Sequence, residues 1–236
     1  MKIDRRLTLG ERLCCVVFPA RCLCCGRAVL PQRLFCDSCA GSLPEDWENR
    51  KLYLKEAPEG VLQVKACLPY DQGFRRTLHR LKFQEERALA KPIGQLMGEA
   101  ARSFGLVFQA VVWVPMSDKK LRQRGYNQSE LLARSMAKEL NLSALAALEQ
   151  VRETGFQHTK SLVQRVDNVR DAYRATHAVA GKDLLLVDDI ITTGATLLSC
   201  TQSLYLAGAK SVCGLCAAST PLRSVEEESQ SEKEAR

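Results

Sequence analysis

Hydrophobic and polar residues alternate along the chain in two different rhythms. Largely apolar runs predict four strands, at residues 61–71, 110–115, 184–187 and 211–219. Between and after these runs, apolar residues recur every three to four positions, which predicts helices at 74–84, 88–104, 127–140 and 196–209. Either Asn127 or Ser129 suits the N-cap of the third helix, and Gly208 stops the fourth. Strands that alternate with helices favour an α/β fold, in which a parallel sheet is flanked by helices.

The two ends of the chain differ in composition from this α/β region. We divide the chain into an N-terminal region that contains a small cysteine-rich module (1–45, with the module at about 13–45), a polar linker (46–60), the α/β domain (61–223) and a tail (224–236). The tail, SVEEESQSEKEAR, has five acidic and two basic residues and few apolar ones, so we predict that it is disordered.

Four cysteines of the N-terminal module have the spacing of a metal site. Cys22 and Cys25 form one Cys-x-x-Cys pair, and Cys36 and Cys39 form a second pair farther along the chain. Two such pairs can surround one ion tetrahedrally, and a structural Zn²⁺ would stabilise a segment that is too short to have a core of its own. Two alternatives stay open: Cys24 could replace Cys22 or Cys25 as a ligand, or the pairs could be redox-active. Because redox pairs do not usually come doubled, the spacing favours zinc.

The other cysteines lie in apolar runs and are better explained as small core residues: Cys14, Cys15, Cys67, Cys200, Cys213 and Cys216. Cys213 and Cys216 also have Cys-x-x-Cys spacing, but they lie in a predicted strand, where alternation sends their side chains to opposite faces. We therefore do not count this pair as a site.

The composition is that of a globular protein with an excess of positive charge. Hydrophobic residues make up 46% of the chain, yet none of its apolar runs approaches the ~18–20 residues of a membrane-spanning helix. The apolar stretch at 13–20 is too short and too rich in cysteine for a signal peptide, so we expect the protein to be cytoplasmic. The chain has a formal net charge of +7; since the tail carries −3, the remainder carries +10. Such a charge favours anionic partners, either phosphorylated metabolites or nucleic acid.

The segment 184–196, LLLVDDIITTGAT, combines the features of a sugar-phosphate site. Asp188 and Asp189 are expected to emerge at the carboxyl end of a buried strand, where open α/β sheets bind ligands. The small residues 192–196 then lead into a helix, so backbone N–H groups, threonine hydroxyls and the helix N-terminus could together bind a phosphate. The carboxylates would supply acceptors for ribose hydroxyls. Alternatively, the acids merely cap a turn; adjacent acids on a strand also point to opposite faces, so only one can reach a given ligand directly.

The complete order of residues in this segment resembles the phosphoribosyl-pyrophosphate (PRPP) signature of type I phosphoribosyltransferases. A second block, formed by Val114-Pro115, Lys119-Lys120 and residues 122–128, resembles the ComF family, whose members share that fold. Spaced polar residues match the same family: Thr154, Gln157, Ser161, Arg165, Asn168 and Tyr173. The resemblance extends over about residues 13–219, and its departures are Lys160, Ser117 and Asp118. It implies a type I phosphoribosyltransferase-like parallel sheet flanked by helices, with a small N-terminal zinc-ribbon-like module.

The resemblance also implies a role for each residue of the two blocks. Asp188 and Asp189 would contact the ribose hydroxyls, one of them through a water bound to Mg²⁺. The 5′-phosphate would be held by Thr192, Thr193, Gly194, Ala195 and Thr196. The loop 116–120 would receive the diphosphate with Mg²⁺, using Lys119 and Lys120, although Asp118 places an acid there. A mobile segment that closes over the site would contain Arg122, Arg124, Gly125 and Tyr126. Asp188, Asp189 and Arg124 would be the catalytic residues.

Some of these residues also have plainer explanations. The basic residues at 119, 120, 122 and 124 could form a solvated face, and Gln157, Arg165 and Asn168 could bond the backbone of a long loop. His79, His158 and His177 have no assignable partner. The interpretation of 184–196 as a ribose site would fail if the two carboxylates were buried in an ion pair.

Three functions are compatible with these features. ComF-like proteins are associated with natural competence, the uptake of DNA, and the related GntX-type members are named from gluconate utilisation. The chain could transfer a phosphoribosyl group from PRPP to an unknown acceptor, or bind PRPP as a regulator without transferase activity. It could also handle single-stranded DNA during competence, or bind other competence proteins. Only 6% of the residues are aromatic and a basic–aromatic array is not apparent, so recognition by base stacking is weakly supported.

Overall fold

The computed structural model describes residues 20–31, 33–54, 60–152, 172–175 and 179–221. Several residues considered above lie outside these ranges: Cys14, Cys15, Thr154, Gln157, His158, Lys160, Ser161, Arg165, Asn168, His177 and the tail 224–236. The interpretations of these residues remain predictions.

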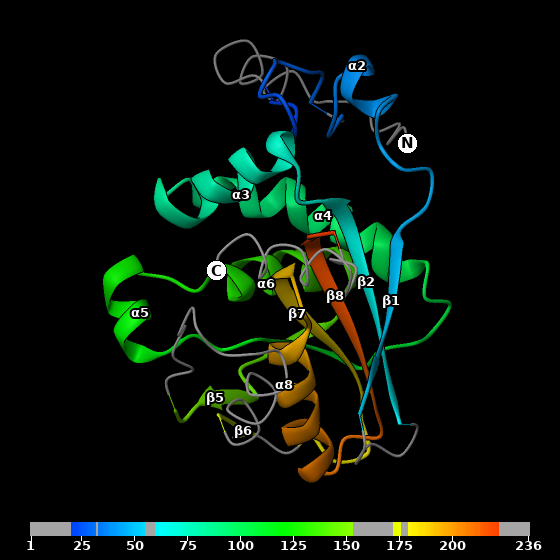
Figure 1. Cartoon of the computed structure of the whole chain (residues 1–236), viewed down its shortest axis with the longest axis vertical. Helices are drawn as coiled ribbons and strands as arrows, with labels where there is room; N and C mark the ends of the chain where they lie inside the picture. The colour runs from blue at the N-terminus through cyan, green and yellow to red at the C-terminus, as the bar shows by residue number, and fades with distance from the viewer. Residues whose placement is uncertain (1–19, 32, 55–59, 153–171, 176–178, 222–236) are drawn as a thin grey trace, which may run out of the picture.

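The centre of the molecule is a six-stranded, mostly parallel sheet (Figure 1). Its strands are β1 (Glu48–Tyr53), β2 (Val61–Pro69), β3 (Ala110–Trp113), β4 (Ser143–Leu145), β7 (Asp183–Ile191) and β8 (Ser211–Ser219). They lie in the order β1-β2-β8-β7-β3-β4, and β1 is the antiparallel one at the edge. A separate two-stranded ribbon pairs β5 (Leu148–Gln150) with β6 (Tyr173–Ala175). The carboxyl ends of the parallel strands therefore meet at one edge of the sheet.

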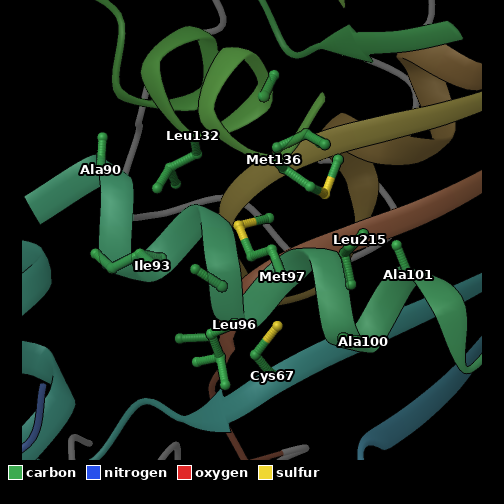
Figure 2. Packing of buried hydrophobic residues seen from close by; sticks show 14 of the residues in the cluster. Cys67, Ala90, Ile93, Leu96, Met97, Ala100, Ala101, Leu132, Met136 and Leu215 are labelled. Atoms are coloured by element: carbon green, nitrogen blue, oxygen red, sulfur yellow. The ribbon is translucent and has the colours of Figure 1, made fainter. Parts of the chain in front are cut away.

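Helices cover both faces of this sheet. One face is packed by α3 (Gln72–Phe83), α4 (Ala90–Arg102) and α6 (Gln128–Leu140), and the other by α8 (Ala195–Leu206). Short helical segments lie elsewhere in the chain: α2 (Asp37–Ala40) in the N-terminal module, η1 (Arg87–Leu89) between α3 and α4, and α5 (Asp118–Arg124) between β3 and α6. Figure 2 shows the first face, where Ile93, Leu96 and Met97 of α4 lie between the strands and α6.

Strict alternation along the central strands divides the core between the two faces. In β7, Leu185 and Val187 belong to the cluster beneath α4 and α6, whereas Leu184 and Leu186 belong to the cluster beneath α8. Cys213 and Cys216 are likewise buried in different clusters. The prediction that the side chains of this Cys-x-x-Cys pair point to opposite faces is confirmed.

The predicted strands and helices are present, but the structure also differs from the prediction, and the short strands β4, β5 and β6 were not predicted. Strand β7 continues to Ile191 instead of ending at Val187, because residues up to 191 keep pairing with β8. The stretch predicted as a linker contributes β1, which pairs with β2 along its whole length. The basic block after β3 forms the helix α5. Asn127, rather than Ser129, is the N-cap of α6, because its Oδ1 accepts from the backbone N–H of Ser129 at 2.9 Å.

The N-terminal module docks on α3. Leu23 is 1% exposed and belongs to the same core cluster as Leu78 and Leu81 of that helix. The Thr77 hydroxyl donates to the Leu23 carbonyl oxygen at 2.6 Å. Helix α3 thus connects the module to the sheet domain. In the described ranges we find no helix with both the length and the apolar character needed to cross a membrane.

Candidate functional site

Strand β7 carries the two adjacent acids into the carboxyl edge of the sheet. Asp188 lies opposite Cys216 of β8, so the acids are part of the paired strand rather than of the loop after it. The next neighbour on the other side, β3, ends at the same edge and leads into Asn127 and Ser129. Asn127 donates through Nδ2 to the Val114 carbonyl oxygen at 3.0 Å, which fixes the start of α6 to the end of β3.

Asp188 is held by donors from two elements. The Ser129 hydroxyl donates to its Oδ1 at 2.8 Å, and the backbone N–H of Asp189 donates to the same oxygen at 2.8 Å. Burial, together with repulsion from the Asp189 carboxylate, raises the pKa of Asp188 to about 7 in spite of these donors. The site therefore contains a carboxyl group that changes charge near neutral pH.

Asp189 forms an ion pair with a lysine from α3. Lys82 Nζ lies 2.7 Å from Asp189 Oδ2, and the two side chains are 18% and 14% exposed. This ion pair meets, for one of the two carboxylates, the condition under which a ribose site would fail. A ligand hydroxyl at Asp189 Oδ2 would compete with Lys82, the last residue but one of α3.

The loop after β7 places small residues at the start of α8. Thr192 and Thr193 are exposed, and Gly194 has a positive φ of 81° as the residue before the helix. The backbone N–H of Ala195 donates to Thr193 Oγ1 at 3.4 Å. This geometry leaves two hydroxyls and the first amides of a twelve-residue helix beside the acids, an arrangement suited to an anion.

Two features favour glycine at position 194: its positive φ and the closeness of the Leu52 side chain. A Cβ at this position would collide with Leu52 Cδ1 of β1. We expect Gly194→Ala to lower the free energy of unfolding by about 2–4 kcal/mol, because a positive-φ penalty adds to a steric one. Urea denaturation measures this change. Gly181→Ala is the matched control, since Gly181 also has positive φ (70°) but no atom within 4 Å of the place that a Cβ would occupy, and an equal loss in both variants would contradict the role of Leu52.

The raised pKa of Asp188 predicts a pH-dependent cost to stability. Because its pKa in the folded protein is about 7 and the ordinary value is 3.8, the folded state retains a proton that the unfolded state releases between these values. The free energy of unfolding should thus fall as the pH rises from 4 to 7. We expect Asp188→Asn to stabilise the protein at pH 8, by a few kcal/mol at most, and to have little effect at pH 4. Asp183→Asn, at the other end of β7, should act oppositely, since Ser211 and Lys210 lower the pKa of Asp183.

The basic block lies on α5 and at its C-terminus. Lys119 and Lys120 are exposed in the first turn of this helix. Arg124 donates through Nη1 to Gln128 Oε1 at 3.1 Å. Its guanidinium lies 4.8 Å from the centre of the ring of Phe83, the residue that follows Lys82. Arg124 therefore contacts the end of α3, the helix that also carries Lys82. Tyr126 is buried and donates to the Leu81 carbonyl oxygen, so it anchors this segment to α3.

The four predicted metal ligands converge. The Sγ atoms of Cys22, Cys25, Cys36 and Cys39 all lie within 4.8 Å of one another. Cys25 Sγ and Cys36 Sγ are 3.7 Å apart, close to the ~3.8 Å that a tetrahedral ion with bonds of about 2.3 Å requires. Burial raises the pKa of the Cys22 thiol, but hydrogen bonds from neighbouring residues outweigh it and lower the pKa to about 7. The cluster can hold a metal such as zinc.

Cys24 is not part of this cluster. Its Cβ lies 3.3 Å from the place where a Cβ on Gly73 would stand, so it packs against the start of α3. Burial, together with repulsion from Cys22 and Asp71, raises the pKa of the Cys24 thiol to about 12.

Two residues that contact the acids were not identified from the sequence: Lys82, and Ser129 as a donor to Asp188. Neither were Arg50 of β1, which donates to the Thr192 carbonyl oxygen, and its partner Glu48. Lys82 is one of several basic residues on a helix, and Ser129 was considered only as a helix cap. Arg50 lies in the stretch predicted as a linker. No local pattern distinguishes these residues from ordinary surface residues.

Known proteins are similar in sequence to this chain over the region that contains these residues. The family described as the phosphoribosyl transferase domain matches residues 127–234, a range that contains Ser129, both acids and the threonine loop. The DNA utilization protein YhgH of Salmonella typhimurium is 30% identical over 199 residues, covering 81% of this chain and 86% of the relative. Competence protein F of Haemophilus influenzae is 28% identical over 187 residues, covering 75% and 81%. The chain belongs to the ComF family.

This member of the ComF family combines a phosphoribosyltransferase fold with an N-terminal cluster of four cysteines. Among solved structures, glutamine PRPP amidotransferase from B. subtilis superposes with a TM-score of 0.39 at 22% identity, covering 55% of this chain and 26% of that one. A similarity this weak carries no argument about the function of the ComF-family chain.

Proposed function

We propose that the chain binds PRPP with Mg²⁺ at the carboxyl edge of the sheet and transfers its phosphoribosyl group to an acceptor. One observation carries this proposal: two carboxylates near the end of β7 are followed, after Ile190 and Ile191, by a loop with exposed Thr192 and Thr193 that opens α8. The carboxylates supply acceptors for the ribose hydroxyls. The loop supplies hydroxyl and amide donors for the 5′-phosphate.

Binding in this site would exchange one ion pair for new contacts. When the ribose hydroxyls donate to Asp188 and Asp189, the Ser129 hydroxyl would still hold Asp188 in place, and Lys82 would leave Asp189. The released lysine then faces a ligand with several phosphate charges. An anion with a diphosphate group compensates the loss of the ion pair better than a neutral sugar does.

The chemistry would be displacement of diphosphate from the anomeric carbon of the ribose. The bond from that carbon to diphosphate breaks as the acceptor atom approaches, and the positive charge that develops on the ring requires stabilisation rather than a protein nucleophile. Arg124, Lys119 and Lys120 are the cations of this chain that would stabilise the departing diphosphate. Mg²⁺, when bound with PRPP, supplies further charge neutralisation on the leaving group.

In the N-terminal module, Cys22, Cys25, Cys36 and Cys39 would hold a structural Zn²⁺. Four thiolates close the coordination sphere, so this ion would stabilise the fold and leave no position for a substrate. Its effect on the site would pass through α3, on which the module docks and which carries Lys82.

Calorimetry with PRPP in the presence and absence of Mg²⁺ tests the binding part of this proposal. We expect saturable binding that requires Mg²⁺ for full affinity. A screen for diphosphate release with a panel of nucleobases and amines then tests turnover. Binding without release over the whole panel would favour a regulator that senses PRPP. The absence of binding would contradict the proposal.

Binding of single-stranded DNA is a second candidate, favoured by relatives named for competence and DNA utilization. The chain outside its tail carries a net charge of +10, which suits a polyanion. Filter binding to a single-stranded oligonucleotide should show affinity that falls steeply with salt concentration. Failure to bind at low salt would exclude this candidate while leaving the PRPP proposal intact.

A further inference from the structure

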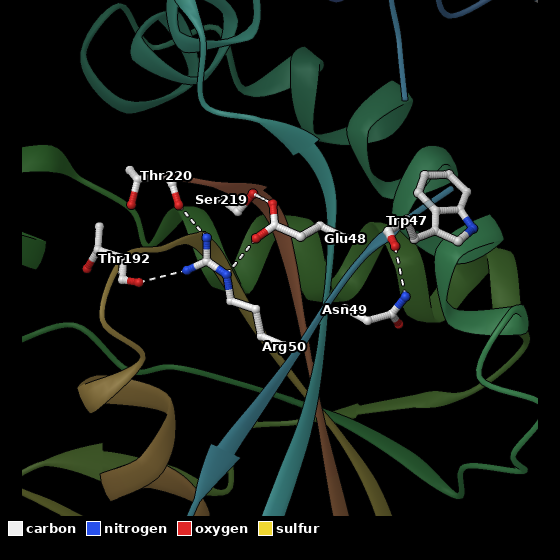
Figure 3. A network of polar contacts seen from close by, with 7 residues as sticks. All are labelled: Trp47, Glu48, Asn49, Arg50, Thr192, Ser219 and Thr220. Carbon is white, nitrogen blue, oxygen red and sulfur yellow. Dashed lines mark hydrogen bonds and ion pairs between the residues drawn. The ribbon is translucent and has the colours of Figure 1, made fainter. Parts of the chain in front are cut away.

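The side chain of Arg50 on β1 contacts the loop 192–196, which we propose binds the phosphate. Its Nη1 donates to the Thr192 carbonyl oxygen at 2.8 Å, and its Nη2 donates to the Thr220 carbonyl oxygen (Figure 3). Its Nε donates to Glu48 Oε1 at 2.6 Å, and the Ser219 hydroxyl donates to the other oxygen of Glu48. The Arg50 side chain is only 5% exposed. Each nitrogen of its guanidinium therefore donates a hydrogen bond, and together these bonds join three chain segments.

These segments are the ends of the two strands that define the site, together with β1 itself. Thr192 follows β7 and Thr220 follows β8, and the backbone N–H of Thr220 donates to the Ile191 carbonyl oxygen at 3.0 Å. A second residue of β1, Leu52, fills the space above Gly194. Strand β1 thus contacts the loop before the helix at two points, through a charged group and through an apolar one.

The hydrogen bond from Arg50 to the Thr192 carbonyl oxygen determines the orientation of the peptide group between Thr192 and Thr193. The carbonyl of Thr192 and the N–H of Thr193 belong to one planar trans peptide group, so they point in opposite directions. Because Arg50 holds the carbonyl oxygen, the N–H of Thr193 points away from the Arg50 guanidinium. Without Arg50, the carbonyl would lose its donor, and the peptide could rotate to find another.

We propose that Arg50 is a positioning residue that presets the loop 192–196 for a phosphate. This inference rests on the proposed function in so far as the loop binds the 5′-phosphate of PRPP. Arg50 itself does not contact the ligand. Its effect is to keep one donor of the loop directed away from its own guanidinium before the ligand arrives, which removes the cost of ordering that peptide on binding.

The first test compares Arg50→Met with Lys51→Met in ligand binding. Lys51 is the exposed neighbour on the same strand, so both variants lose one positive charge, but only Arg50→Met loses the network. We expect Arg50→Met to weaken binding of PRPP and of ribose 5-phosphate by about 10-fold each, and Lys51→Met by less than about 2-fold. Binding of Mg²⁺-diphosphate, which lacks the 5′-phosphate, should be unchanged. Equal affinities in Arg50→Met and the wild type would overturn the proposal, and so would an equal loss for all three ligands.

The second test needs no ligand and separates this inference from the proposed function. Hydrogen exchange of the amides in 190–197 should be about 10-fold faster in ligand-free Arg50→Met than in the wild type, and unchanged in Lys51→Met. If the wild type does not bind PRPP, the proposed function fails, and the exchange result still decides whether Arg50 holds the loop. Unchanged exchange in Arg50→Met would overturn the inference even when PRPP binds.

Arg50→Lys keeps the proposal testable if Arg50→Met does not fold. Lysine retains the charge but lacks the planar fork that reaches two carbonyl oxygens at once. For Arg50→Lys, we expect an amide exchange rate and a ribose 5-phosphate affinity between the wild-type values and those expected for Arg50→Met. Values equal to the wild type would show that a charge alone suffices, which contradicts an anchoring role for the guanidinium.

Discussion

Replacement of Asp188 and Asp189 by asparagine together is expected to weaken PRPP binding by at least about 100-fold. Each carboxylate would accept a hydrogen bond from a ribose hydroxyl, and hydrogen bonds to charged groups contribute about 1.5–3 kcal/mol each. The loss is measured by calorimetry with PRPP and Mg²⁺. Asp183→Asn is the control, because it makes the same change of side chain at the opposite end of the same strand. An unchanged affinity in the double variant would exclude the proposed site.

The ion pair between Lys82 and Asp189 requires one further comparison. Asparagine at position 189 leaves Lys82 without its partner in a partly buried place, so Asp189→Asn alone could weaken binding indirectly. Combining Asp189→Asn with Lys82→Met removes the unpaired charge. If Asp189 is a ribose acceptor, this combination binds ribose 5-phosphate more weakly than Lys82→Met alone. Equal affinities in the combination and in Lys82→Met would assign Asp189 a structural role as the partner of Lys82.

Loss of the metal from the four-cysteine cluster is expected to unfold the N-terminal module. Structural zinc contributes about 10–16 kcal/mol in finger peptides, and this module is too small to replace that contribution by packing. We expect Cys36→Ser combined with Cys39→Ser to reduce the zinc content from about one ion per chain to nearly none. Mass spectrometry of the metal measures this loss. Hydrogen exchange should then increase in residues 20–41 and in α3, because Leu23 leaves the core cluster that it shares with Leu78 and Leu81.

Cys24→Ser is the matched control for this experiment. Cys24 lies in the same module, but it packs against α3 and is not among the converging thiols. The variant should therefore retain zinc and the exchange protection of residues 20–41. Loss of zinc from Cys24→Ser, or its retention in the double serine variant, would contradict the assignment of the ligands.

Local patterns predicted the parts of the fold that depend on neighbouring residues. The apolar run 211–219 is strand β8, and the periodic pattern after Asn127 is helix α6 with that residue as its cap. The two Cys-x-x-Cys pairs converge as their spacing predicts. In each case, the determining interactions lie within a few residues or follow from strand alternation, so that composition and period suffice. The missed strand β1 has a polar sequence, ENRKLY, whose strand conformation depends on pairing with β2 rather than on its own residues.

The sequence by itself determined the α/β class, the cysteine cluster and the position of two acids and a threonine loop next to each other along the chain. Tertiary structure alone decided which residues surround them. Lys82 reaches Asp189 from a helix more than a hundred residues earlier in the chain, Ser129 reaches Asp188, and Arg50 reaches Thr192. Such contacts between distant segments depend on how strands are ordered in the sheet and how helices pack on it. A single lysine, serine or arginine carries no local sign of the partner that this packing brings to it.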